Sequence, residues 1–162
     1  MGRPLNPGTA WQTRADVWTE FLVDDGHGGL IFDYSYAERY NPVHSNGYEW
    51  ISQVHEIIEE LKIHPDSRQL YLSVWDPHID IKNLGKHRVP CTLGYLFQNR
   101  GGQLHVTYMM RSCDFATHFQ NDLYLSTSLR NFIAAQAGVK IGRFTHFVGS
   151  FHIYNKDVKG VF

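Results

Sequence analysis

The chain has 162 residues, of which 43% are hydrophobic and 19% charged, and its formal net charge is −1. A near-neutral chain lacks the basic field that nucleic-acid binding by charge alone requires. No stretch approaches the run of about 18 apolar residues that a membrane span needs, and no signal peptide opens the sequence. Length and composition indicate a single globular domain over residues 1–162. Two cysteines do not make a disulfide framework, which favours the cytoplasm.

The N-terminal part of the chain mixes irregular, helical and extended patterns. Residues 1–12 hold two prolines, two glycines and no periodicity, which predicts an irregular arm. A capping-box pattern at Thr13 predicts a helix that carries Trp18 and Leu22 and ends near the glycine-rich turn at 24–29. Residues 30–40 alternate loosely and predict an extended segment.

The clearest periodic segment comes next. Apolar side chains recur at helical spacing between Trp50 and Leu61, with acidic and basic residues on the other face, and predict a helix. The His-Pro-Asp sequence at 64–66 ends it. Residues 69–75 predict a strand, and residues 76–90 predict a loop.

The C-terminal half predicts a hairpin, a helix and a last strand. Residues 92–98 and 103–110 flank an Asn-Arg-Gly-Gly turn. A helix is expected over about 121–137, with Gly138 as its left-handed cap, and a strand over 143–154. The whole pattern predicts an α+β fold in which a mostly antiparallel, mixed sheet packs with about three helices.

Cys91 and Arg111 are the first candidates for chemistry. Two strands joined by a short turn bring both residues to the same end of the hairpin. A free cysteine is more often a small buried hydrophobic residue, and a thiol needs a cationic setting to react near neutral pH. Arg111 could supply that setting, although an isolated arginine more often makes a surface salt bridge.

Several polar pairs could bind a small anion or a sugar. Arg111 with Ser112 offers guanidinium donors beside a hydroxyl, which suits a phosphate, and Ser67 with Arg68 repeats the pair. Each pair is equally common in turns.

Asp114 and Asp122 bracket the start of the third helix, where acids are also favoured electrostatically. His152 and Tyr154 stand two apart on a strand and share a face, where they could bind a sugar hydroxyl or simply pack. No His-Glu-x-x-His or Cys-x-x-Cys pattern occurs, and no metal site is expected.

In order along the chain, these signals resemble the thymidylate synthase and deoxycytidylate hydroxymethylase family from about Trp18 to Tyr154. The matching pieces are VW at 17–18, PDSRQLYLSVWDP at 65–77, PC at 90–91, RSCD at 111–114, ND at 121–122 and GSFHIY at 149–154.

The resemblance implies a role for each candidate residue. Cys91 would attack carbon 6 of a pyrimidine nucleoside monophosphate, so that carbon 5 takes up a one-carbon unit from 5,10-methylenetetrahydrofolate. Arg111 and Ser112 would hold the phosphate, and Arg111 would lower the thiol pKa. Arg68 would reach the phosphate of the partner subunit in a homodimer. Asp114 would lie along the base, and His152 and Tyr154 would bind the ribose. Trp18 would make a weak folate contact.

Asp122 stands where thymidylate synthases carry asparagine and deoxycytidylate hydroxymethylases carry aspartate. A carboxyl group matches the amino and ring-nitrogen edge of cytosine better than an amide set for uracil. The resemblance therefore favours a dCMP hydroxymethylase, with dUMP methylation as the alternative. Asp122 could instead be an ordinary helix-start acid, with Asn121 turned toward the base after a small shift.

Parts of the family pattern have no counterpart in these 162 residues. They are an N-terminal segment with a catalytic glutamate and a tail that closes over the folate. The histidine after the nucleophile is Thr92, and the glutamine before the Arg-Ser pair is Met110. The folate half of the site is thus expected to be incomplete. Three hypotheses follow: a compact one-carbon transferase, of a kind that would suit a base-modifying virus; a non-catalytic nucleotide-binding homologue; or a plain structural domain.

Overall fold

The computed structural model describes residues 22–24, 26–32, 36–40 and 52–158. Residue contacts divide the chain into two units, Met1–Ser35 and Tyr36–Phe162. In the first unit, β1 (Leu22–Asp24) and β2 (Leu30–Phe32) form an antiparallel pair. The predicted helix is therefore wrong at Leu22, which lies in a strand, and its other residues fall outside the described part of the chain. A single domain over 1–162 stays a prediction.

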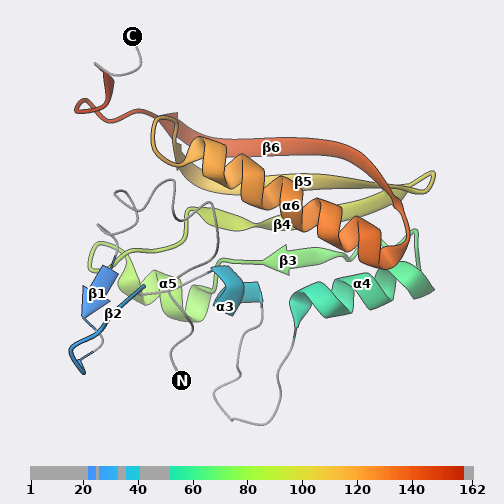
Figure 1. Cartoon of the computed structure of the whole chain (residues 1–162), viewed down its shortest axis with the longest axis horizontal. Coiled ribbons are helices and arrows are strands. Elements are labelled where there is room, and N and C mark those ends of the chain that lie inside the picture. The colour runs from blue at the N-terminus through green and yellow to red at the C-terminus, as the bar shows by residue number, and fades with distance from the viewer. Residues whose placement is uncertain (1–21, 25, 33–35, 41–51, 159–162) are drawn as a thin grey trace. The chain divides into compact units, whose positions relative to one another are not determined.

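The second unit contains a four-stranded sheet in the order β3-β4-β5-β6 (Figure 1). Its strands are β3 (Tyr71–Ser73), β4 (Thr92–Arg100), β5 (Gln103–Asp114) and β6 (Lys140–His152). The first three are antiparallel, whereas β6 runs parallel to β5 because α6 (Phe119–Ala137) connects the two. The predicted α+β fold with a mixed, mostly antiparallel sheet is confirmed.

The hairpin of β4 and β5 is regular at one end and irregular at the other. At the turn, Gly101 and Gly102 have φ angles of 59° and 75°, which residues with a side chain rarely adopt. At the open end the register shifts between Thr92 and Gly94, which marks a β-bulge one residue after Cys91. Bulges re-aim neighbouring side chains, and this one sits beside the predicted nucleophile.

Two long helices pack on one face of the sheet (Figure 1). Helix α4 (Gln53–Ile63) begins at Ser52, whose hydroxyl accepts a hydrogen bond from the His55 amide, and buries Ile57, Ile58 and Leu61. Helix α6 ends at Gly138, which is left-handed with φ 71°. Both helices were predicted, because their periodicity and end signals agree.

Two short helices were missed. Helix α3 (Tyr36–Tyr40) lies where an extended segment was predicted, and α5 (Pro77–Asn83) lies inside the predicted loop. Asp76 caps α5 by accepting from the amide of His78, and Pro77 fits the first helical turn. Both signals were present in the sequence, but a helix of seven residues is too short to show a period.

The core lies between the helices and the sheet. Leu72, Tyr95 and Tyr108 point into it from three neighbouring strands and pair in register. The opposite face of the sheet exposes apolar side chains, and Phe147 is 61% exposed there. The remaining core residues come from both long helices and from β3 to β5: Ile57, Ile58, Leu61, Leu70, Val74, Phe97, Leu104, Val106, Met110, Cys113, Ile133 and Ala134.

Candidate functional site

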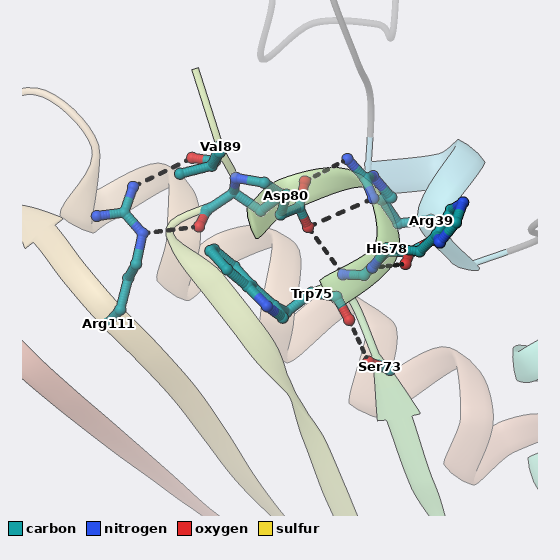
Figure 2. Close-up of polar contacts among 9 residues, drawn as sticks. Arg39, Ser73, Trp75, His78, Asp80, Val89 and Arg111 are labelled. Carbon is teal, nitrogen blue, oxygen red and sulfur yellow. Dashed lines mark hydrogen bonds and ion pairs between the residues drawn. The ribbon is translucent and has the colours of Figure 1, made fainter. Parts of the chain in front are cut away.

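Cys91 and Arg111 meet at the open end of the hairpin. The amide of Arg111 donates to the Cys91 carbonyl at 2.9 Å, and the Nη2 atom lies 3.9 Å from the Cys91 sulfur. The guanidinium also donates from Nε to the Pro90 carbonyl at 3.0 Å and from Nη2 to the Val89 carbonyl at 3.1 Å (Figure 2). These two bonds orient the guanidinium plane beside the sulfur.

Arg111 keeps donors for a further ligand. A guanidinium has five N–H groups, and the bonds to Pro90, Val89 and Cys91 use three of them. The two N–H groups on Nη1 have no hydrogen-bond partner among the described residues, and the side chain is exposed. Ser112 follows in the strand and is half-buried. The pair therefore has the donors that a phosphate group requires.

Burial has the largest influence on the pKa of the Cys91 thiol. Removal from water raises the pKa of Cys91, while Arg111 lowers it, Asp122 raises it and Arg88 lowers it to smaller extents. Arg111 thus acts in the predicted direction, but burial outweighs it because a thiolate is poorly solvated there.

Asp122 lies in the first turn of α6 and is half-buried. Burial raises the pKa of its carboxyl to about 7, and a hydrogen bond from Cys113 opposes that shift. The Cys113 sulfur lies 3.6 Å from Oδ2 of Asp122. At neutral pH this carboxyl is therefore part protonated, which sets it apart from the exposed acid that usually begins a helix. Beside it, Nδ2 of Asn121 is buried with no hydrogen-bond partner among the described residues.

The structure brings Asp114 beside the end of β6. Asp114 pairs in register with His152 and is 5% exposed, and its Oδ1 accepts from the Ala116 amide at 3.1 Å. Strand β6 ends at His152, so Tyr154 does not continue the strand as predicted. Their rings still meet, with centroids 5.1 Å apart, because the chain bends after the strand.

The structure does not bring Arg68 to Cys91. Arg68 is exposed and precedes β3, whose first residue, Tyr71, pairs with Leu96. It therefore lies toward the turn end of the hairpin, away from the open end that carries Cys91. Trp18 lies outside the described residues.

A buried network of hydroxyl groups adjoins the site and was not predicted. The Thr92 hydroxyl lies 2.7 Å from the Tyr108 hydroxyl, and the Thr92 amide donates to the Tyr36 hydroxyl at 3.4 Å. Tyr108 stacks on Tyr95 with ring centroids 4.6 Å apart. Thr92 is the residue after Cys91 and is fully buried, so these contacts fix the backbone at the nucleophile. The sequence signal for this network was Thr92, a hydroxyl residue at the position where the resemblance implies a histidine.

The Tyr95 hydroxyl extends this network. It lies 3.2 Å from the Ser126 hydroxyl on α6 and 3.3 Å from the Tyr40 hydroxyl on α3. Burial is the largest cause that raises the pKa of both Tyr40 and Tyr95, so both phenols stay neutral at physiological pH. The phenols can therefore donate or accept hydrogen bonds but carry no charge into the site.

An ion pair braces the segment that leads to Cys91. Arg39 on α3 lies 2.8 Å from Oδ1 of Asp80 on α5, and Asp80 is fully buried (Figure 2). Oδ2 of Asp80 also accepts from the Asp76 amide at 2.8 Å. The brace fixes α5, and the chain runs from there through Val89 and Pro90 to the site.

The described residues contain no group of three or more potential metal ligands. Among them, no helix is both long and apolar enough to cross a membrane.

Comparisons with known proteins give a consistent result. A family model described as "Thymidylate synthase" matches residues 9–162. The chain is 32% identical over 161 residues to a Methanosarcina barkeri protein named "Putative thymidylate synthase", covering 94% of this chain and 70% of that one. A Methanosarcina acetivorans protein of the same name is 31% identical, with 65% of its length covered. A thymidylate synthase of Listeria monocytogenes is 29% identical over 126 residues, which are 78% of this chain and 39% of that protein.

Proposed function

Because the chain belongs to the thymidylate synthase family, we propose that it transfers a one-carbon unit to carbon 5 of a pyrimidine nucleoside monophosphate, with Cys91 as the nucleophile. The family is one of one-carbon transferases, as the sequence motifs predicted. The observation that carries the proposal is the 3.9 Å approach of the Arg111 guanidinium to the Cys91 sulfur. A nucleophile beside a guanidinium that keeps donors for a ligand suits a planar ring that bears a phosphate.

The described residues divide the chemistry among them. The sulfur of Cys91 forms a bond to carbon 6, the C5–C6 double bond opens, and its electron pair moves to carbon 5 and into the ring. The thiol proton is lost to solvent in this step. Arg111 stabilises the attacking thiolate electrostatically and holds the phosphate through Nη1, while Ser112 adds a hydroxyl donor. His152 and Tyr154 bind the ribose, and Asp114 lies along the base.

Deoxycytidylate is the favoured substrate, and its product is hydroxymethylated. Asp122 supports this choice because its buried carboxyl titrates near neutrality. A half-protonated carboxyl accepts from the amino group of cytosine and shares its proton with the basic ring nitrogen. The carbonyl oxygen of uracil can only accept a hydrogen bond, as an ionised carboxyl does, so the two groups would repel each other. A mismatched polar edge costs about 1–3 kcal/mol in a buried site.

Methylation of deoxyuridylate is the second candidate. The relatives that match most of this chain are named for thymidylate synthase activity. The buried Nδ2 of Asn121, which has no partner among the described residues, also offers an amide donor next to Asp122, of the kind that the uracil edge accepts. Either product requires the same attack by Cys91.

We propose 5,10-methylenetetrahydrofolate as the one-carbon donor, as in the family. The one predicted folate contact, Trp18, lies outside the described residues. Tyr95 and Tyr108 are two aromatic residues of the buried hydroxyl network, and both are fully buried against each other, so neither can stack on a pteridine ring. The roles assigned to the described residues therefore all belong to the nucleotide half of the site, and Trp18 stays a predicted folate contact.

The proposed enzyme is a homodimer. Arg68 is exposed and distant from its own Cys91, so it can reach a phosphate only in another subunit. The helix-free side of the sheet offers a surface for that partner, since Tyr71 and Phe147 are 44% and 61% exposed there. Sheet face against sheet face would bury these apolar side chains.

Product analysis tests the proposal. The protein is incubated with methylenetetrahydrofolate and either dCMP or dUMP, and each nucleotide is followed by mass spectrometry. We expect the mass of dCMP to increase by one hydroxymethyl group in the wild type and to stay unchanged with Cys91→Ser. A methyl group added to dUMP alone would establish the second candidate. Unchanged masses for both nucleotides would contradict the proposed activity.

A further inference from the structure

The carboxyl of Asp122 is held by a single neighbouring side chain. Cys113 donates to Oδ2 at 3.6 Å, and no other side chain among the described residues donates to this carboxyl. Cys113 is 1% exposed and lies two residues after Arg111 on β5. The competing acceptor, the carbonyl oxygen of Asp114, is 3.9 Å from the sulfur. A thiol has one proton, and the nearer carboxyl oxygen is the stronger acceptor.

We infer that Cys113 is a positioning residue for base recognition. Its thiol occupies Oδ2 of Asp122 and leaves Oδ1 to meet the edge of the pyrimidine. The inference rests on the proposed function, because the pyrimidine is the ligand proposed there.

The chemistry of the thiol suits a fixed donor. Burial, together with the nearby Asp122 carboxyl, raises the pKa of Cys113 to about 12, so the group stays protonated through the physiological range. Cys113 is therefore unsuited to nucleophilic attack, whereas at Cys91 the nearby Arg111 partly offsets the rise in pKa that burial causes. Its hydrogen bond favours the ionised form of Asp122 and opposes the effect of burial.

The hydrogen bond from Cys113 is the one side-chain interaction among the described residues that shifts the pKa of Asp122 against burial. The titratable groups that hydrogen-bond to Asp122 or whose pKa responds to its charge lie on α3, on β4 and β5, and just before β4. They are Tyr40 on α3, Cys91 before β4, Tyr95 on β4, and Tyr108 and Cys113 on β5. Within the described part of the chain, no cation contributes to the pKa of Asp122. A change at Cys113 should therefore appear directly in the protonation of Asp122.

Two variants of Cys113 test the inference in the free protein. The carboxyl band of Asp122 is assigned in infrared spectra by its loss in Asp122→Asn and is then titrated. Cys113→Ala removes the donor and should raise the pKa of Asp122. Cys113→Ser supplies a stronger donor of similar size and should lower it. A packing defect would not move the two variants in opposite directions.

Nucleotide binding gives the second readout. Dissociation constants for dCMP and dUMP are measured below and above pH 7 for the wild type, Cys113→Ala and Cys113→Ser. We expect the ratio of the two constants to change by about tenfold in Cys113→Ala, the size of one lost hydrogen bond to a charged group, and to be largely preserved in Cys113→Ser. Identical Asp122 titrations in wild type, Cys113→Ala and Cys113→Ser would overturn the inference alone. Failure of the wild type to bind either nucleotide would overturn the proposed function and the recognition role with it.

Discussion

The two ends of the β4–β5 hairpin are built on different principles. At the turn end, Gly101 and Gly102 occupy positive φ angles, and the strand register is uninterrupted from Gly94 to Arg100. At the open end the register breaks, and a thiol, a guanidinium and a buried carboxyl gather around the bulge. The turn end follows the backbone preferences of a tight hairpin turn, although Oδ1 of Asn99 is buried there without a hydrogen-bond partner among the described residues. The open end combines a bulge with a half-buried thiol and a guanidinium. Such local conflict is the expected mark of a functional site, and variants at the two ends should behave differently.

Loss of the Arg111 guanidinium should have the largest effect on activity among the variants. Arg111→Lys keeps the charge but cannot bond Pro90, Val89 and a phosphate together, so we expect kcat/KM for the nucleotide to fall by about 100-fold. The matched control at the turn end is Arg100→Lys, because Arg100 donates to the carbonyl of its own neighbour Asn99. Steady-state kinetics should show little change in that control. Equal losses in both variants would remove the distinction between the two ends.

Asp122→Asn should remove a pH dependence of folding stability. The folded pKa of about 7 lies above the ordinary aspartate value of 3.8, so the native state binds more protons than the unfolded state between these limits. Wild-type stability should therefore fall as pH rises through this window, by roughly 2–4 kcal/mol. The asparagine variant should lack this contribution and be relatively more stable at pH 8. Urea unfolding of both proteins at pH 5 and pH 8 measures this contribution. An equal change in the free energy of unfolding between the two pH values in wild type and variant would contradict a raised pKa of Asp122.

Tyr108→Phe should affect both stability and catalysis. It leaves the buried Thr92 hydroxyl without its 2.7 Å partner, which costs about 1–3 kcal/mol in the free energy of unfolding. Because Thr92 adjoins Cys91, kcat should fall as well. Thr92→Val combined with Tyr108→Phe removes both hydroxyls and should restore part of the stability without restoring kcat. Full recovery of kcat in the double variant would show that the network does not position the nucleophile.

The smallest effect is expected at the turn end. Gly101→Ala places a side chain at φ 59° with open space around it, so only backbone strain of about 1 kcal/mol is added. Activity should stay at the wild-type level, because the turn lies far from the bulge. Thermal melting and product formation measured on the same sample would check this, and a large loss of activity would contradict it.

The same contrast explains what could be predicted from the sequence. The hairpin, α4 and α6 were predicted because period, caps and turn glycines are local properties of the chain. The meeting of Cys91 and Arg111 followed from the hairpin topology. Helices α3 and α5 were missed because five and seven residues carry too little periodicity.

Electrostatic and long-range features of the site lay beyond the sequence. The net rise of the Cys91 pKa depends on burial, which no spacing reveals. The contact from Cys113 to Asp122 requires α6 to return over β5, and the hydroxyl pair of Thr92 and Tyr108 crosses two strands. Motif order indicated that Cys91 and Arg111 share one end of the hairpin, and the structure supplies their hydrogen-bond partners.

Covalent trapping tests the central claim most directly. The wild type, Cys91→Ser and Gln103→Ala are each incubated with methylenetetrahydrofolate and the 5-fluoro analogue of dCMP or dUMP, and the intact proteins are weighed by mass spectrometry. We predict one nucleotide adduct on the wild type and on the turn-end variant Gln103→Ala, mapped to Cys91 by proteolysis, and none on Cys91→Ser. Tight nucleotide binding without an adduct, or an adduct mapped to Cys113, would contradict the account.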